Sequence, residues 1–299
     1  MAIQEPFEPD AAEVKRERIT RPGASTRTRV ITHEGGEVRQ RSDAVATEEP
    51  LEIRLHHIGD DYISSVTMRT PGNDFELATG WLLAEGIVRG PDDVTRIAYC
   101  VDRSVGEEQR YNIVNVHLRQ DPGRDFASIE RDFFTTSACG VCGKAGLDQL
   151  ATKATRVESQ LMVPSETVCS LPGKLRAAQG VFERTGGLHA AGLFDSTGEL
   201  VGLREDVGRH NALDKLLGWA LLERMLPLSD CMVLVSGRAS FELAQKSVVA
   251  GVPVMCAVSA PSSLAIEVAR DFNMTLVGFL RDERFNVYTG ADRIRGAGA

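Results

Sequence analysis

The fold class of this chain is decided by residues 231–280, which read CMVLVSGRASFELAQKSVVAGVPVMCAVSAPSSLAIEVARDFNMTLVGFL. Three short apolar runs predict buried strands, and two longer segments between them predict helices: the strands at 231–235, 254–258 and 275–280, the helices at 240–250 and 263–272. Strands that alternate with helices in this way pair in parallel through right-handed crossovers. The stretch therefore predicts an α/β fold with a partly parallel sheet.

A polar loop follows each of these strands, and ligands of parallel sheets bind beyond the carboxyl ends of the strands. The loops are Ser236–Ser240, Ser259–Ser263 and Phe279–Arg284. The first two lead small residues into helix N-termini, which suit phosphate oxygens, and the third carries two arginines. Together they predict a pocket for a phosphate-bearing ligand. The alternative is that the serines only cap helices and the arginines are solvated surface charges.

The segment before this stretch predicts a hairpin over residues 181–203, with a first strand that runs to Gly186. Its histidine, His189, is either a packed core residue or a functional one. The following segment is densely polar for a chain interior and forms either a salt-bridge cluster or part of a site: Arg204, Asp206, Arg209 and His210. Asn211 then caps a long helix, with Asp214 at its third position.

The first half of the chain indicates an α+β arrangement. Residues 30–41 predict a hairpin around Gly35, and further strands follow, at 51–55, 62–69, 97–102 and 111–118. Asn73 begins a helix, with Glu76 as its capping-box partner. We therefore predict five segments: a disordered arm (1–28), an α+β domain (29–134), a cysteine loop with a following helix (135–150), an α/β domain (151–290) and a flexible tail (291–299).

The cysteine loop spans residues 135–144 and reads TTSACGVCGK. Cys139 and Cys142 are each followed by glycine, and a lysine comes next, so the loop is open and electropositive. A helix-like run then begins at Ala145. Because a helix N-terminus and a nearby cation favour a thiolate over a thiol, the motif predicts reactive sulfur.

A single CxxC pair is also compatible with other chemistry. Structural zinc usually needs a second pair of ligands, which only His189 or His210 could supply here, so we expect no zinc. A thioredoxin-type site would follow an early strand of a small α/β domain, whereas this CxxC pair lies in mid-chain, after an α+β half, which argues against that type of site. The histidine stretch also echoes cytidine deaminases, but Ala191 stands where their catalytic glutamate would be, and the cysteines precede the histidine. We therefore expect no deaminase activity.

The composition of the 299 residues is that of a globular protein, with 42% apolar and 25% charged residues. The net charge of −8 predicts no bulk attraction to nucleic acid or to anionic membranes. The longest apolar stretch is too short to span a bilayer, and the N-terminus does not resemble a signal peptide, so we expect a cytoplasmic protein. Cys231 and Cys256 lie in apolar runs and are expected to be inert core residues.

Several ordered motifs together resemble one family. They are the cysteine loop, TGGLHAA (185–191), the polar segment 204–215, VSGRASFE (235–242), SAPSSL (259–264) and FNVY (285–288). On these motifs the chain resembles the formate dehydrogenase accessory sulfurtransferases, which carry sulfur for the molybdenum cofactor. The resemblance covers about residues 48–290.

The resemblance implies a cytidine-deaminase-like α/β fold that has lost zinc chemistry, and a homodimer. It implies that a cysteine desulfurase loads sulfur onto Cys139 as a persulfide, with Cys142 as the assisting thiol. The sulfur then passes to the bis-molybdopterin guanine dinucleotide cofactor before that cofactor enters formate dehydrogenase. The residues that the resemblance assigns to the cofactor are those of the third strand-end loop: Phe279, Leu280, Arg281, Asp282, Glu283 and Arg284.

Two other classes of function remain open on sequence alone. A thiol–disulfide oxidoreductase would cycle a Cys139–Cys142 disulfide and carry no persulfide. A binding chaperone would only hold the cofactor, and its cysteines would dock a partner.

Overall fold

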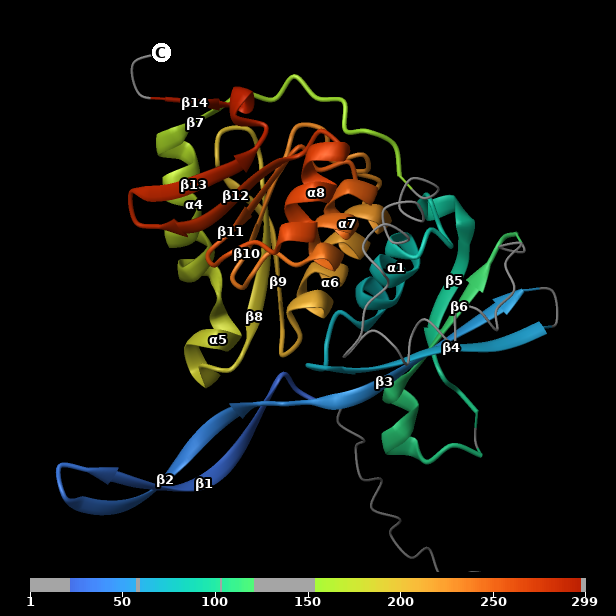
Figure 1. Cartoon of the computed structure of the whole chain (residues 1–299). Coiled ribbons are helices and arrows are strands. Elements are labelled where there is room, and N and C mark those ends of the chain that lie inside the picture. Colours follow the sequence, from blue (N-terminus) through green and yellow to red (C-terminus); the bar gives the residue numbers. More distant parts are fainter. Residues whose placement is uncertain (1–21, 58–59, 103, 121–153, 297–299) are drawn as a thin grey trace, which may run out of the picture.

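The computed structural model describes residues 22–57, 60–102, 104–120 and 154–296. Its larger sheet has the strand order β13-β12-β11-β10-β8-β9 (Figure 1). The three strands predicted to be parallel are so: β10 (Met232–Val235), β11 (Val254–Ala257) and β12 (Thr275–Arg281). Antiparallel strands complete both sides: β8 (His189–Phe194) and β9 (Leu200–Asp206) on one, β13 (Arg284–Thr289) on the other. The α/β class with a partly parallel sheet is confirmed.

Helices cover both faces of this sheet because successive strand residues point to opposite sides. Val233 and Val235 belong to one buried cluster, together with residues of three helices: α6 (Arg209–Leu222), α7 (Phe241–Val249) and α8 (Ser263–Asp271). Met232 and Leu234 belong to a second cluster, together with residues of α4 (Ser165–Ala178). A run that is apolar at every position therefore marks a strand buried on both faces.

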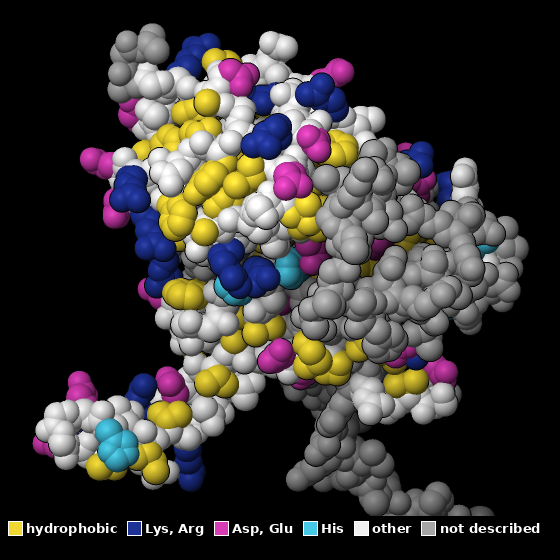
Figure 2. All heavy atoms as spheres, viewed as in Figure 1, with side chains coloured by type: hydrophobic (Ala, Val, Ile, Leu, Met, Phe, Trp, Pro, Cys, Tyr) yellow, Lys and Arg dark blue, Asp and Glu magenta, His cyan; other side chains and the backbone are white. Residues whose placement is uncertain are grey.

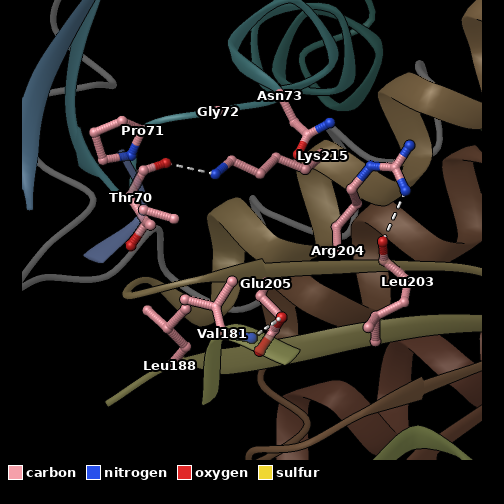
Figure 3. Close-up of a pocket in the computed structure, with 11 residues that line it drawn as sticks. Thr70, Pro71, Gly72, Asn73, Val181, Leu188, Leu203, Arg204, Glu205 and Lys215 are labelled. Atoms are coloured by element: carbon pink, nitrogen blue, oxygen red, sulfur yellow. Dashed lines mark hydrogen bonds between the residues drawn. The ribbon is translucent and has the colours of Figure 1, made fainter. Parts of the chain in front are cut away.

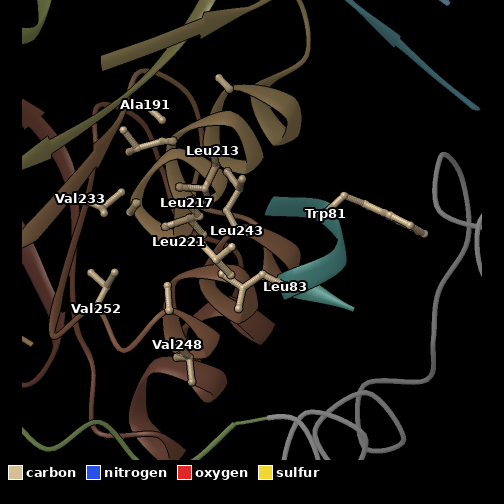
Figure 4. Close-up of a cluster of buried hydrophobic side chains, with 14 of the residues drawn as sticks. Trp81, Leu83, Ala191, Leu213, Leu217, Leu221, Val233, Leu243, Val248 and Val252 are labelled. Carbon is tan, nitrogen blue, oxygen red and sulfur yellow. The ribbon is translucent and has the colours of Figure 1, made fainter. Parts of the chain in front are cut away.

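A second sheet, of order β4-β3-β6-β5, lies beside the first (Figure 1). It comprises β3 (Glu49–His57), β4 (Asp60–Arg69), β5 (Val94–Tyr99) and β6 (Ile113–Leu118), with short 3₁₀ turns at Pro91–Asp93 and Glu107–Asn112. Helix α1 (Asp74–Ala84) joins it to the larger sheet by packing on α6. Leu51 of β3 and Leu276 of β12 belong to one buried cluster, part of which Figure 4 shows around the α1–α6 contact. The domain boundaries stay predictions.

Both ends of the described chain are more regular than predicted. Strands β1 (Ser25–Glu34) and β2 (Glu37–Ala46) form one long hairpin, so regular structure begins inside the arm predicted for residues 1–28. Residues 291–299 were predicted to form a flexible tail. Instead, a 3₁₀ turn (Ala291–Arg293) leads into β14 (Ile294–Arg295), which pairs with β7 (Val163–Pro164). The pairing of β14 with β7 is long-range, which is why local composition did not reveal it.

Three local predictions are wrong. Residues 180–185 form helix α5 (Gly180–Thr185) and not the first strand of a hairpin, which begins only at β8. Asn73 precedes α1 in the left-handed conformation with no side-chain cap, and Glu76 pairs instead with Arg204. The residue that caps α6 is Gly208, not Asn211.

No described helix has both the length and the apolar character needed to span a bilayer.

Candidate functional site

The three strand-end loops meet at one edge of the larger sheet, as their positions predict. Ser259 N donates to Gly237 O at 3.2 Å, and Ser262 N donates to Ala239 O at 2.9 Å. Phe279 N donates to Ser259 O at 3.1 Å. Because backbone hydrogen bonds tie each loop to the next, their side chains share one surface.

Two helices begin at this edge. Ser240 precedes α7 but makes no side-chain hydrogen bond to the helix, whereas the Ser262 hydroxyl accepts from Ala265 N and caps α8. The first N–H groups of α7 therefore lack a side-chain cap from the helix's own N-cap residue. Such groups, together with the helix dipole, favour an anion.

The third loop differs from the prediction. Strand β12 continues through Arg281, turns at Asp282–Glu283 and returns as β13, so that Arg281 pairs with Arg284 across the turn. Leu280 is fully buried in the second core cluster, so its side chain cannot contact a ligand. Arg281 and Arg284 are exposed, and Arg281 Nε donates to Val258 O at 3.4 Å. The two guanidinium groups are available at the edge.

Phe279 has a backbone conformation that is rare for its type. Its φ of 53° lies in the left-handed region, beside an irregularity in the pairing of β12 with β13. The side chain is half-buried at the loop junction. A phenylalanine at positive φ is held there by its surroundings, and such positions cluster at functional sites.

His189 also lies at this edge, which sequence reasoning left undecided. Strand β8 runs antiparallel to β10, so the first residue of β8 lies beside the last residues of β10. Ser236 Oγ accepts the N–H of Ala190 at 2.9 Å and lies 3.4 Å from His189 Nδ1. Burial, and then the charge of Arg209, lower the pKa of His189 below its usual range. Its imidazole is therefore neutral at pH 7.

His210 forms a second polar contact at the edge. Its Nε2 lies 3.4 Å from Glu242 Oε2 and 3.3 Å from Ser240 Oγ, at the start of α7. Burial outweighs the attraction of Glu242 and lowers the pKa of His210 to about 4. Figure 2 shows basic side chains beside histidine side chains on this face of the molecule. The edge thus combines cations with neutral hydrogen-bonding groups.

Arg209 carries an unused donor. Its Nε is buried and has no hydrogen-bond partner in the part of the chain that the structure describes. A Cβ built on Gly237 would lie 3.7 Å from Arg209 Cδ and 3.5 Å from His189 Nδ1. The glycine lets the β10 loop approach both side chains closely. An orphaned guanidinium donor at such a place suits an anionic ligand.

The polar segment before α6 divides into structural and edge residues. Asp206 is fully buried and accepts from Thr70 N, Gly208 N and Asn211 Nδ2, and it pairs with Lys215 at 2.7 Å. Arg204 donates to Glu76 at 2.9 Å and lies over the Trp219 ring. Arg204 and Asp206 are therefore structural, whereas Arg209 and His210 reach the edge.

A cavity of about 150 Å³ lies next to this segment, and sequence reasoning did not find it. Figure 3 shows that its walls come from the β4–α1 turn, β9 and α6. Lys215 donates to Thr70 O at 2.7 Å, and Glu205 accepts the N–H groups of Val181 and Phe182. Since its charged groups already have protein partners, the cavity holds no charge free for a ligand.

The predicted reactive cysteines, Cys139 and Cys142, lie outside the described residues. Three of the described cysteines, Cys169, Cys231 and Cys256, are poor nucleophiles. Burial raises the pKa of Cys256 to about 12, and it also raises the pKa of Cys231 and Cys169. Their thiols stay protonated, as expected for Cys231 and Cys256 from the apolar runs that hold them.

The metal expectation is also untested at the cysteine loop. Among residues 22–57, 60–102, 104–120 and 154–296, no three His, Cys, Asp or Glu side chains gather as a metal site. Ala191, at the position of the deaminase glutamate, is fully buried and pairs with Val235 in the sheet. That position therefore supplies no general acid or base.

A family model described as the FdhD/NarQ family matches residues 46–295. The chain belongs to this family. The resemblance stated from the sequence motifs is thereby confirmed. Among FdhD relatives, the sulfur carrier protein FdhD of Streptomyces coelicolor is 51% identical over 271 residues, which cover 90% of this chain and 95% of the relative.

More distant FdhD proteins match over similar lengths. The sulfur carrier protein FdhD of Mycobacterium tuberculosis is 47% identical, covering 91% of this chain and 99% of the relative. That of Sulfurisphaera tokodaii is 43% identical, covering 84% and 92%. A crystal structure from Desulfotalea psychrophila, of a protein described as a formate dehydrogenase accessory protein, aligns with a TM-score of 0.70. It is 24% identical and covers 91% of this chain and 100% of that one, which supports the fold.

Proposed function

We propose that this chain is a sulfur carrier that serves the maturation of formate dehydrogenase. The observation that carries the proposal is family membership, with FdhD sulfur carriers 43–51% identical over at least 84% of the chain. The Cys139–Cys142 pair, with a glycine after each cysteine and a lysine next in the sequence, suits the chemistry that a sulfur carrier needs. Cys231 and Cys256, whose thiol pKa values are raised by burial, are poor candidates for that role.

In the loading step, the thiolate of Cys139 attacks the outer sulfur of a persulfide held by a cysteine desulfurase. A new S–S bond forms on Cys139, the S–S bond of the donor breaks, and the donor cysteine leaves as a thiolate. The oxidation level of the transferred sulfur is unchanged. Lys144 and the helix that the sequence predicts from Ala145 would favour the thiolate that this attack requires.

In the delivery step, the thiolate of Cys142 attacks the inner sulfur on Cys139. A Cys139–Cys142 disulfide forms, and the outer sulfur leaves with the bonding electron pair and takes up a proton as hydrosulfide. The two cysteines are oxidised and the transferred sulfur is reduced. A thiol reductant must then restore the dithiol before the next cycle.

The acceptor in this proposal is bis-molybdopterin guanine dinucleotide, bound as cargo at the strand-end edge before it enters formate dehydrogenase in the cytoplasm. What supports this placement is the chemistry of the edge. Arg281, Arg284 and the orphaned Nε of Arg209 can donate to phosphate oxygens, as can the first N–H groups of α7. The neutral imidazoles of His189 and His210 can bond groups of either polarity.

Mass spectrometry tests the sulfur-carrier proposal directly. The purified chain is incubated with a cysteine desulfurase and cysteine, and the peptide that contains residues 135–144 is analysed without reductant. We expect a gain of about 32 Da, the mass of one sulfur, on that peptide. Cys139→Ala should lose the gain, and Cys231→Ala, which removes a half-buried thiol elsewhere, should keep it.

Two results would contradict the proposal, and each supports a different function. A loop peptide that becomes about 2 Da lighter and never heavier indicates a disulfide oxidoreductase. An unmodified loop in a chain that still retains the cofactor indicates a binding chaperone.

A further inference from the structure

Glu242 places a carboxylate at the strand-end edge. It is the second residue of α7, directly after the loop Ser236–Ser240, and its side chain is 37% exposed. His210 Nε2 lies 3.4 Å from Glu242 Oε2, and Lys246 Nζ lies 3.6 Å from Glu242 Oε1. Neither contact is a hydrogen bond, and no other side chain of the described residues donates one to this carboxylate. Its oxygens therefore retain acceptor capacity.

The two basic neighbours of Glu242 do little to neutralise it. Lys246 is buried, and its ammonium donates to both carboxylate oxygens of Asp214, at 2.7 and 2.8 Å. The charge of Lys246 is therefore largely compensated by Asp214. The imidazole of His210 is neutral at pH 7, because burial lowers its pKa to about 4. Glu242 thus combines a negative charge with acceptor capacity at an exposed position of the edge.

A carboxylate does not suit the phosphates for which the rest of this edge is fitted. Arg281, Arg284 and the orphaned Nε of Arg209 can donate to phosphate oxygens. A carboxylate repels the same oxygens, because both groups are negative and both only accept hydrogen bonds. What a carboxylate attracts is a ligand group with hydrogen-bond donors. The edge therefore suits a ligand that carries phosphates at one end and a pair of donors at the other.

We propose that Glu242 recognises the guanine base of the nucleotide bound at this edge. The inference rests on the proposed placement of the cofactor, and it assigns the residue that selects the base. Guanine presents two neighbouring donors, N1–H and the N2 amino group, and a carboxylate can accept from both in a bidentate arrangement. The phosphates of the same nucleotide would contact the arginines and the first N–H groups of α7.

The same carboxylate disfavours adenine. Adenine presents an amino donor next to the acceptor nitrogen N1, so the N1 lone pair would face a carboxylate oxygen. One hydrogen bond is lost and two acceptors are brought together, and both effects weaken the binding of adenine. Glu242 is therefore a specificity-determining residue of the proposed site. It has no part in the transfer of sulfur itself.

Titration calorimetry of the full-length chain with three nucleotides tests this assignment. Guanosine, adenosine and xanthosine diphosphate share their phosphates and differ in the base, and xanthine has a carbonyl where guanine has its N2 amino group. The wild type should bind guanosine diphosphate at least about 10-fold more tightly than either of the others. Glu242→Gln replaces one acceptor with a donor. It should weaken guanosine diphosphate roughly 10- to 150-fold and strengthen xanthosine diphosphate about 10-fold, which reverses their order.

Glu267→Gln is the matched control, because it removes the same charge from an exposed glutamate of α8, the helix that packs on α7. It should leave the order of the three nucleotides unchanged. A glutamate in the first turn of a helix also stabilises the helix dipole. If that were the only role of Glu242, Glu242→Gln would reduce the repulsion of phosphate and strengthen all three nucleotides alike. That result would overturn the proposal.

The experiment also separates base recognition from cofactor placement. If Arg281→Ala weakens guanosine diphosphate but Glu242→Gln does not, the placement stands and the role of Glu242 is wrong. A wild type that binds none of the three nucleotides would overturn both. Misfolding cannot produce a gain of affinity for xanthosine diphosphate, and circular dichroism checks the fold of each variant. Sulfur loading on Cys139, assayed on the same preparations, tests the carrier role independently of these outcomes.

Discussion

Replacing Gly218 with alanine probes the closest contact between α1 and α6. A Cβ built on Gly218 would lie 1.8 Å from Glu76 O and 2.6 Å from Gly80 N. On the other helix, a Cβ built on Gly80 would lie 1.9 Å from Asp214 O. The atoms that would be hit are backbone atoms, so they cannot rotate away as a side chain could.

The expected loss of stability follows from this geometry. To restore an ordinary contact of about 3.5 Å, the two helices would have to separate by roughly 1.7 Å. Overpacking a core costs about 1–3 kcal/mol and occasionally more. Alanine is about 1 kcal/mol better than glycine inside a helix, which offsets part of the loss. Because a 1.8 Å approach to rigid backbone lies beyond the usual range of overpacking, we expect a net loss of about 2–4 kcal/mol.

Urea unfolding followed by circular dichroism measures this loss, and the melting temperature should fall by roughly 5–15 °C. Gly173→Ala is the matched control, because Gly173 lies on the exposed side of α4 with nothing within 4 Å of a built Cβ. That variant should gain about 0.5–1 kcal/mol. If Gly218→Ala is as stable as wild type, or if the two variants behave alike, the close-contact argument is wrong.

Three further outcomes are expected. Arg281→Ala or Arg284→Ala should weaken guanosine diphosphate binding by roughly 10- to 150-fold in titration calorimetry. Arg270→Ala, which changes an exposed arginine of α8, is the control and should leave the affinity unchanged. Equal affinity in all three variants would contradict the proposal that the cofactor binds at this edge. Since the pKa of His210 is lowered to about 4, the unfolded chain binds its proton first, and stability should fall as pH drops from about 6.5 toward 4. In urea unfolding, His210→Gln should lose less stability than the wild type over this pH range. An unchanged pH dependence of the unfolding free energy in this variant would contradict the assignment to His210. Elemental analysis should find no stoichiometric zinc, and one zinc per chain that is lost when both loop cysteines become serine would overturn that expectation.

The described elements match the sequence best where the evidence is local. Apolar runs at 231–235 and 254–258 predicted strands because a strand buried on both faces must be apolar at every position, and the strands observed are Met232–Val235 and Val254–Ala257. The carboxyl ends of parallel strands share one edge, so the meeting of the three loops followed from the same pattern. The prediction of reactive sulfur at Cys139 and Cys142 rests on neighbouring residues alone, and it stays a prediction because these residues lie outside the described structure.

The partners of the buried and half-buried carboxylates could not be predicted from the sequence. Glu76 was read as a capping partner for its own helix, but its carboxylate meets Arg204, which is 128 positions away. Asp214 was read in the same way, but it is buried and pairs with Lys246 at 2.7 Å. A charge that the fold buries must find a partner among whatever groups surround it. Those surroundings exist only after helices and sheets have packed.

The sequence by itself determined the class of fold, the family and the sheet edge at which the three strand-end loops meet. Only the tertiary structure decided which residues of that edge face outward. Leu280 belongs to the predicted binding segment and is fully buried, while His189 and Arg209 come to the edge from other elements. The physical reason is that sequence patterns record the alternation of side chains along one strand or helix. Which residue of another element contacts a given side chain depends on how the separate elements pack, and no local pattern contains that information.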